Sequence, residues 1–272
     1  MGKKLALCIG INDYPGTDSD LSGCVNDAND WGKLLKQKGF TVKSLLNKKA
    51  TRKKILESLV SIVDQAEKGD SIVLQYSGHG TYIPDEDNDE LDGTDECLCP
   101  YDLRTAGPIT DDELNEIFTS KKNGVKLVLL SDSCHSGTVT RFAEVKTPPA
   151  TSGRRPPVRK VKFLPPANFL SKKELAKLGT TRNFRRSSAP GRYGSLLMSG
   201  CQDVEYSYDA WFRDRPNGAF TFVALETLKH LKPSATYQDW YKAIRKILPS
   251  QQYPQSPNMY GSRTMKKWKI FS

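Results

Sequence analysis

Histidine is scarce in this sequence: only three of the 272 residues are histidines, at positions 79, 135 and 230. Long apolar runs are absent too, and none approaches the roughly 20 residues that a membrane-spanning helix requires. The N-terminus has two lysines before an apolar stretch, as a signal peptide does. That stretch ends at Asn12 and Asp13 without a small-x-small cleavage site. These absences predict a cytoplasmic protein with no membrane partner.

Cysteine motifs typical of metal binding are also missing. The six cysteines include a close pair, Cys97 and Cys99, but this pair has no partnering C-x-x-C or H-x-H. In a chain of this length without an export signal, the cysteines are expected to be reduced thiols. We therefore expect neither a disulfide framework nor a zinc site.

Acidic residues are nearly absent from residues 145–192, which contain 13 Lys and Arg but only one acid, Glu174. This segment also holds seven of the 16 prolines. The rest of the chain has 28 basic and 30 acidic residues, so the formal net charge of +10 belongs to this segment. Such a composition predicts an exposed, largely irregular insertion with one short helix near 171–178.

Outside this basic insertion, short apolar runs alternate with amphipathic segments. The runs predict buried strands, and apolar residues at helical spacing predict helices. Strands are expected at 3–11, 40–46, 71–76, 125–130 and 264–272, and helices at 25–39, 51–70, 110–118, 218–231 and 236–248. Thr110 and Glu113 have the spacing of a helix capping box. Residues 81–108 are expected to form an acidic, turn-rich loop.

This alternation predicts an α/β fold with a doubly wound, mostly parallel sheet and helices on both faces. Sheets of this kind place functional residues at the carboxyl ends of their strands. Two short motifs fall at such ends: "SGHG" at 77–80 and "SDSCHSG" at 131–137. We therefore expect the functional residues among these two motifs.

Cys134 lies in the second motif, where it could be a metal ligand, half of a disulfide or a nucleophile. A thiolate is nucleophilic, and a nearby imidazole can remove the thiol proton and later protonate a leaving amine. His79 lies between two glycines at the other strand end, whereas His135 is a rival base whose side chain should diverge from that of its neighbour. We predict a dyad of His79 and Cys134, with the main-chain N–H groups of Gly80 and Cys134 binding the oxyanion. The alternative is a buried cysteine beside an ordinary turn histidine.

The order of "YSGHG" and "DSCHSG" resembles the metacaspases and their bacterial relatives, the orthocaspases. The likeness extends to "GINDYPG", "LSGCVNDA", "DGTDECLCPYD", "ITDDEL" and "LLMSGCQD", and covers roughly residues 3–140 and 194–231. It implies one caspase-like peptidase domain over residues 1–272, with a six-stranded sheet, interrupted by the basic insertion. It also implies cleavage of polypeptides after Arg or Lys by His79 and Cys134.

The resemblance places the binding site for the substrate's basic side chain at Cys24, Asp27, Ser77 and Asp132. Two carboxylates facing a guanidinium or ammonium group form strong charge-assisted hydrogen bonds once water is excluded. Asp27 has a simpler alternative role, as an acid in the first turn of a helix. We expect both aspartates to contact the substrate.

Many members of this family bind calcium through aspartates, which correspond here to Asp95, Asp111 and Asp112. The fourth family position is Arg141, a cation where a carboxylate is expected. Because calcium needs several oxygen ligands, a positive charge at this position opposes its binding. We therefore expect no required cofactor, with a weakened calcium site as the alternative.

Three roles compete for the basic insertion: a plain linker, a nucleic-acid-binding arm, or a substrate of the chain's own active site. Its charge favours nucleic acid, but it has few aromatic residues and no known nucleic-acid-binding fold, so nucleic acid is not the expected partner. An enzyme that cuts after Arg or Lys carries its own substrate in this segment. The candidate self-cleavage residues are Arg154, Arg155, Arg159, Lys160, Arg185 and Arg186.

The sequence thus predicts a monomeric, Arg- and Lys-specific cysteine endopeptidase that processes itself in its basic insertion. The alternative is a catalytically silent caspase-fold module that binds an acidic partner through this segment.

Overall fold

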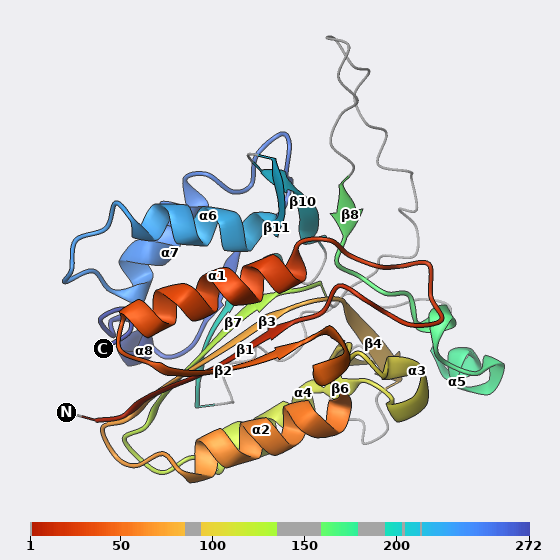
Figure 1. Ribbon diagram of the computed structural model, residues 1–272, viewed down its shortest axis with the longest axis horizontal. Coiled ribbons are helices and arrows are strands. Elements are labelled where there is room, and N and C mark those ends of the chain that lie inside the picture. The colour runs from red at the N-terminus through yellow and green to blue at the C-terminus, as the bar shows by residue number, and fades with distance from the viewer. Residues whose placement is uncertain (1, 85–93, 135–158, 179–193, 203–204, 213) are drawn as a thin grey trace.

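A central sheet of six strands organises the protein (Figure 1). The computed structural model describes residues 2–84, 94–134, 159–178, 194–202, 205–212 and 214–272. The strands follow the order β12-β9-β7-β3-β1-β2. Their bounds are β1 Lys4–Gly10, β2 Thr41–Leu46, β3 Ser71–Ser77, β7 Lys126–Asp132, β9 Leu196–Ser199 and β12 Asn258–Tyr260. All neighbouring pairs are parallel except β12 with β9, so the predicted mostly parallel, six-stranded caspase-like sheet is confirmed.

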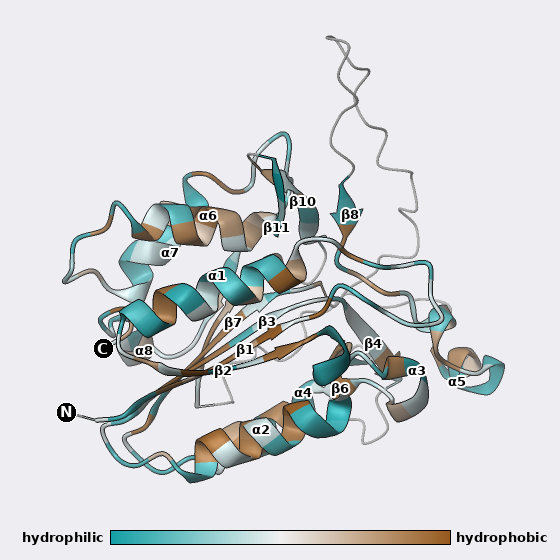
Figure 2. Ribbon diagram, in the orientation of Figure 1, coloured by the Kyte–Doolittle hydropathy of each residue, from teal (hydrophilic) through white to brown (hydrophobic). Residues whose placement is uncertain are grey.

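Helices cover both faces of this sheet (Figure 1). One face packs against α1 (Cys24–Gln37), α6 (Ala219–Leu228) and α7 (Tyr237–Arg245), and its core includes Trp31 and Trp240. The other face packs against α2 (Arg52–Asp64) and α4 (Asp111–Thr119). Figure 2 shows hydrophobic residues concentrated along the central strands, as expected for strands buried on both faces.

Local sequence signals set several of these boundaries. At the start of α4 the Thr110 hydroxyl accepts from the Glu113 N–H, and the Glu113 carboxylate accepts from the Thr110 N–H, so the predicted capping box is confirmed. The expected apolar runs at 71–76 and 125–130 form β3 and β7, and every residue of β3 is buried. No helix among the described residues has the length and apolar character needed to cross a bilayer.

Two smaller sheets correct the expectation of a loop at 81–108 and add strands that the sequence pattern missed. The first contains β4 (Gly80–Pro84), β5 (Thr94–Leu98) and β6 (Ile109–Thr110). The short helix α3 (Leu103–Ala106) lies between β5 and β6 in the chain. The second contains β8 (Lys160–Val161), β10 (Tyr208–Phe212) and β11 (Arg215–Gly218). Both small sheets lie at the carboxyl end of the central sheet (Figure 1). The first is placed there because β4 begins shortly after the end of β3.

The basic insertion is ordered where the structure describes it. Residues 159–178 form β8, a 3-10 turn at Pro166–Asn168 and α5 (Lys172–Lys177), so the expectation of a largely irregular segment is wrong for this part, and the predicted short helix is present. The order has a physical cause, because Lys162 and Leu164 are fully buried. Residues 145–158 and 179–192 lie outside the described residues.

The C-terminal region also differs from the prediction. The sixth strand is β12, and 264–272 does not form a strand but includes most of α8 (Arg263–Lys266). Here a serine cap at Ser262, whose hydroxyl accepts from the Met265 N–H, starts a helical turn. A further 3-10 turn, Asn47–Lys49, follows β2.

Candidate active site

The described parts of the two predicted motifs, residues 77–80 and 131–134, meet at the carboxyl ends of the central strands. Strands β3 and β7 are adjacent and parallel, and Ser77 lies opposite Asp132 in their register. His79 and Cys134 each follow two residues later, at the carboxyl ends of these strands. Both side chains are buried. The fold therefore brings both members of the predicted dyad to the same end of two neighbouring strands.

The ring of His79 is fixed by one of its nitrogens. Its Nε2 lies 2.5 Å from the main-chain carbonyl of Ser19. Because a carbonyl can only accept, the proton of the neutral ring belongs on Nε2. The other nitrogen, Nδ1, is buried and has no hydrogen-bond partner among the described residues. This arrangement leaves Nδ1, which carries the lone pair, as the basic nitrogen of the ring.

Two tyrosines also hold the main chain of His79 in place. The His79 N–H donates to the Tyr14 hydroxyl at 2.7 Å, and the two rings lie 4.6 Å apart. The Tyr76 hydroxyl donates to the His79 carbonyl at 2.6 Å. Gly78 is required here, because a Cβ at this residue would collide with both hydroxyls.

Burial lowers the pKa of His79 from 6.5 to about 4. The Ser19 carbonyl opposes this effect, whereas the nearby Lys162 ammonium adds to it. A neutral imidazole at neutral pH can accept a proton, which is what a general base must do.

Cys134 presents its main-chain N–H and its thiol to different carbonyl groups. The thiol donates to the carbonyl of Glu205 at 2.7 Å. The N–H donates to the carbonyl of Lys162 at 3.1 Å, and the N–H of Gly80 donates to the same oxygen at 3.0 Å. The two donors predicted to bind the oxyanion thus converge on one carbonyl oxygen of the chain itself.

The side chain of Lys162 fills the predicted binding site for a basic residue. Its Nζ lies 3.2 Å from Asp27 Oδ2, 3.1 Å from Asp132 Oδ1 and 2.8 Å from Ser77 Oγ. None of the Lys162 side chain is exposed. We call Asp27, Ser77 and Asp132 the acidic site.

Each carboxylate of the acidic site is held by further donors. Asp27 accepts from Ser77 Oγ, Asn217 Nδ2 and the Gly218 N–H. Asp132 accepts from Ser207 Oγ and from the N–H and hydroxyl of Thr221. These donors fix both carboxylates toward the cation. Ser77 was predicted, whereas sequence reasoning missed Ser207, Asn217, Gly218 and Thr221. Their only sequence signal is that they cluster in the segment 207–221, close to the "GAF" that begins α6.

The charges in this site depend on one another. Burial opposes the positive charge of Lys162, but Asp132, Cys24 and Asp27 outweigh it and raise the pKa of Lys162 well above its usual value. Burial raises the pKa of Asp27, and Lys162 opposes that rise. A buried cation is therefore what allows two carboxylates to share this site.

Cys24 and one unpredicted acid, Asp209, lie next to the acidic site. Cys24 begins α1, is fully buried and lies close enough to the Lys162 ammonium to interact with it electrostatically. Asp209 accepts from the N–H groups of Ser22 and Gly23, so it fixes the turn that leads into α1. Burial raises the pKa of Asp209 to about 6.

A glycine limits the space around the bound cation. A Cβ at Gly218 would collide with the carboxylate of Asp132 and the ammonium of Lys162. This close approach explains why β11 ends in a glycine directly before α6.

The predicted calcium ligands lie on two different elements. Asp95 is buried in β5, and Asp111 and Asp112 occupy the first turn of α4. Among the residues that the structure describes, no group of three or more His, Cys, Asp or Glu side chains is arranged to hold a metal ion. Calcium binding by these residues stays a prediction, and Arg141 lies outside the described part of the chain.

The candidate self-cleavage residues are only partly described. Lys160 lies in β8, and its Nζ donates to the Asp20 carbonyl at 2.6 Å, outside the acidic site. The Arg159 guanidinium lies 6.0 Å from the Tyr208 ring centre. The other four, Arg154, Arg155, Arg185 and Arg186, lie outside the described residues.

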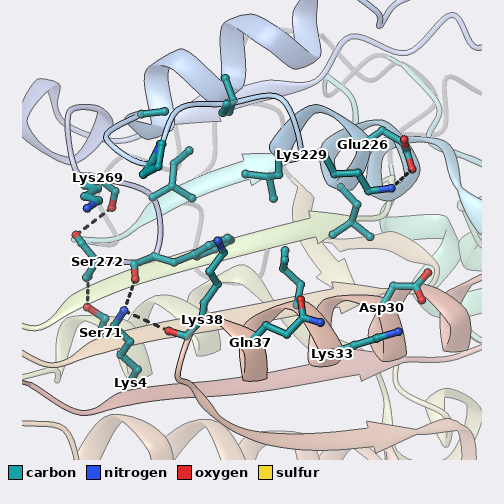
Figure 3. Close-up of a pocket in the computed structure, with 18 of the residues that line it drawn as sticks. Lys4, Asp30, Lys33, Gln37, Lys38, Ser71, Glu226, Lys229, Lys269 and Ser272 are labelled. Atoms are coloured by element: carbon teal, nitrogen blue, oxygen red, sulfur yellow. Dashed lines mark hydrogen bonds and ion pairs between the residues drawn. The ribbon is translucent and has the colours of Figure 1, made fainter.

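A large cavity lies elsewhere in the molecule (Figure 3). It has a volume of about 1150 Å³ and includes Lys4 and Ser71, which begin β1 and β3. His79 and Cys134 follow the opposite ends of the sheet's strands, so this cavity is not their site.

Comparison with known proteins identifies the family of the chain. The family model of the caspase domain matches residues 3–268. The chain belongs to the caspase-domain family of peptidases. It is 31% identical to metacaspase-1 of Cryptococcus neoformans, with 97% of this chain and 63% of that protein covered, and 30% identical to metacaspase-1 of Mycosarcoma maydis, with 96% and 71% covered. The chain thus spans somewhat less than two thirds of the first relative's length.

A solved structure has the same fold over its whole length. Protein GSU0716 from Geobacter sulfurreducens matches with a TM-score of 0.73 and 29% identity, covering 99% of this chain and 98% of that one. The predicted family and fold are therefore confirmed.

Proposed function

We propose that this protein is a cysteine endopeptidase that hydrolyses polypeptides after Arg or Lys through Cys134 and His79. The observation that supports it most is the binding of Lys162: its ammonium lies between Asp27 and Asp132, and its carbonyl accepts from the N–H groups of Gly80 and Cys134. A substrate held in this way has its basic side chain neutralised and its carbonyl carbon beside the thiol-bearing residue.

The proposed reaction uses groups that the fold already orients. Nδ1 of His79 takes the thiol proton, and the sulfur of Cys134 attacks the carbonyl carbon of the substrate. The N–H groups of Gly80 and Cys134 stabilise the oxyanion, and His79 returns the proton to the leaving amine. Water then hydrolyses the thioester. The thiol must first leave its hydrogen bond to Glu205.

Electrostatics supports specificity for basic residues. Asp27 and Asp132 present two buried carboxylates, so an acidic side chain would meet like charges without water to screen them. Lysine and arginine both supply donors to carboxylates, and arginine can bind in a bidentate manner. We expect both residues to be accepted and aspartate to be rejected.

The direct test is an assay of fluorogenic peptides that end in Arg, Lys or Asp before the reporter, with calcium and with a chelator. We expect cleavage after Arg and Lys in both conditions, none after Asp, and none by Cys134→Ala. Asp132→Asn should lower kcat/KM for the Arg peptide by about 100-fold, because it leaves a buried cation with one partner fewer. Asp64→Asn, an exposed acid at the end of α2, is the matched control and should leave kcat/KM unchanged.

A catalytically silent interaction module is the second candidate. The observations that favour it are the thiol hydrogen bond to Glu205 and the occupation of the acidic site by the chain's own lysine. Such a module would bind an acidic partner through the basic insertion without turnover. Absence of any Cys134-dependent peptide cleavage, with or without calcium, would favour it over the peptidase.

A further inference from the structure

The cavity of about 1150 Å³ described above is a groove between α1 and α6, and we call it the helix groove (Figure 3). One wall is a single face of α1, because the lining residues there recur every three to four positions: Asp30, Lys33, Leu34, Gln37 and Lys38. The other wall is α6 with the turn that follows it. Two helices therefore enclose the groove.

The floor of the helix groove is apolar. Helix α6 is buried in the core along one face, through Phe220 and Val223. Its other face lines the groove with apolar side chains that are only partly buried: Phe222, Leu225 and Leu228. Helices that are apolar on every side are normally covered on every side. The groove-facing side of α6 is therefore suited to a further apolar partner.

Basic side chains surround this apolar floor. The groove is lined by seven Lys and Arg side chains and only two acidic ones, Asp30 and Glu226. Both acids already form ion pairs, Asp30 with Arg215 at 3.0 Å and Glu226 with Lys229 at 2.6 Å. None of the remaining five forms an ion pair within the described part of the chain: Lys4, Lys33, Lys38, Lys232 and Lys269.

This positive charge is specific to the groove. Outside the basic insertion the chain has 28 basic and 30 acidic residues, a formal charge of −2. A groove lined by seven basic and two acidic side chains therefore departs from the composition of the body around it. Such a local field attracts and orients an acidic ligand.

We propose that the helix groove is a docking site for an acidic amphipathic helix of a partner polypeptide. The apolar stripe of that helix, with residues at i, i+3, i+4 and i+7, packs on the groove-facing side of α6. Aspartates and glutamates beside the stripe pair with Lys33 on α1 and with Lys232 beyond α6. Docking of this kind uses neither Cys134 nor His79, so the inference goes beyond the proposed function and does not depend on it.

The size and walls of the groove favour a helix over other acidic ligands. Its volume of about 1150 Å³ exceeds the roughly 300–1000 Å³ of sites for small molecules. Peptides that bind as an added strand need an exposed sheet edge, whereas both walls here are helices. Nucleic acid would pair with the lysines through its phosphates, but it presents no aliphatic stripe to α6.

The basic insertion also attracts acidic polypeptides, since it has 13 basic residues and one acid. The two modes of binding make different demands on the ligand. The groove requires apolar residues at helical spacing, whereas the insertion requires only acidic residues. Two acidic peptides of identical composition, one of them scrambled, therefore distinguish the groove from the insertion.

The test measures the binding of three fluorescein-labelled peptides of about 14 residues to the whole Cys134→Ala chain by fluorescence anisotropy. The first peptide carries leucines at helical spacing flanked by glutamates. The second has the same residues in scrambled order, and the third has lysines in place of the glutamates. We expect saturable binding of the first peptide, about tenfold weaker binding of the second, and none of the third.

Variants of the lining residues test the location. Lys33→Glu combined with Lys232→Glu reverses two exposed charges on opposite walls and should weaken binding of the first peptide by about tenfold or more. Lys48→Glu combined with Lys54→Glu is the matched control, because both lysines are exposed and lie outside the groove; affinity should stay within about twofold. Leu225→Ala keeps every charge and should weaken binding about fivefold.

A benzophenone in the apolar stripe of the first peptide gives a second readout of location. Crosslinks to residues 30–38 and 222–235 are expected. Crosslinks to the basic insertion would overturn the inference, as would equal affinity of the first two peptides or an unchanged affinity in the Lys33→Glu, Lys232→Glu variant. Absence of saturable binding of the first peptide would also overturn it.

Other occupants are tested with the same proteins. Vesicles of phosphatidylserine and a single-stranded oligonucleotide replace the peptide in parallel assays. If either binds more tightly than the first peptide and loses this binding in the Lys33→Glu, Lys232→Glu variant, the groove belongs to that ligand and the helix is overturned. None of these outcomes changes the cleavage of Arg peptides, so the proposed function is tested separately.

Discussion

The neighbours of His79 separate its two ring nitrogens by function. The Ser19 carbonyl accepts from Nε2, and the Tyr14 hydroxyl accepts from the main-chain N–H, so the ring cannot rotate freely. Nδ1 remains as the basic atom. Ser19 thereby does with a main-chain carbonyl what a carboxylate does in a Ser-His-Asp triad, orienting the ring without adding a charge.

The lowered pKa of His79 predicts a loss of stability in acid. With a pKa of about 4 in the folded state and 6.5 otherwise, His79 binds fewer protons folded than unfolded between these values, so stability falls as pH falls through this window. In a Cys134→Ala background, we expect the free energy of unfolding to drop by up to about 3 kcal/mol more than in the same background carrying His79→Gln. Urea unfolding at about pH 7 and about pH 4 measures this.

The titration of Asp209 does not affect the difference in stability between these two proteins. Its pKa is raised to about 6, so its contribution has the opposite sign, present at low pH and lost as pH rises through 6. Because both proteins contain Asp209, this contribution cancels in the difference. Equal pH dependence in the two proteins would show that His79 is not buried in its neutral form.

The sequence predicted the placement of the two motif residues but not the role of Lys162. Cys134 and His79 each follow an apolar run typical of a buried strand, so the sequence could predict that both lie at strand ends. Lys162 lies among 13 basic residues in a segment with the composition of an exposed insertion. Its burial depends on Asp27, Asp132 and Ser77, which come from distant parts of the chain, so local composition could not reveal it.

The strands also differed in how well the sequence predicted them. Strands β1, β3 and β7 are buried on both faces, and their continuous apolar runs are visible in the sequence. Strands β8 and β12 have only two and three residues, and pairing with β10 and β9 creates them. Short edge strands carry too few apolar positions to show a period, so β8 was predicted as part of an irregular insertion and β12 was not predicted at all.

The capping boxes allow a prediction for individual helices. Thr110→Ala removes the cap of α4, which packs through Leu114 and Phe118 in the core, so we expect the free energy of unfolding to fall by about 1 kcal/mol in the Cys134→Ala background. Ser171→Ala removes the same type of cap from α5, which has no buried residue, and should change global stability by less than about 0.5 kcal/mol. Urea unfolding measures both; a larger effect at Ser171 would contradict this ranking.

At the scale of the molecule, a cut anywhere in the basic insertion would leave one folded body made of two chains. The N-terminal part supplies β1, β2, β3 and β7, and the C-terminal part supplies β9 and β12 of the same sheet. Strand β7 pairs with β9 from Val128 opposite Leu196 to Ser131 opposite Ser199, and α6 and α7 share a core with α1. The cut therefore separates the chain but not its hydrophobic core.

This arrangement predicts that the two fragments stay together after self-cleavage. Obligate interfaces that resemble a divided core are large and apolar, and they persist without a covalent link. We expect the two fragments produced by a cut in the basic insertion to elute as one species of about the intact mass in size-exclusion chromatography, and to separate only in denaturant. The Cys134→Ala chain, incubated in parallel, gives the elution volume of the uncut protein. Separate elution in native buffer would mean that the sheet depends on the uncut basic insertion rather than on the pairing of β7 with β9.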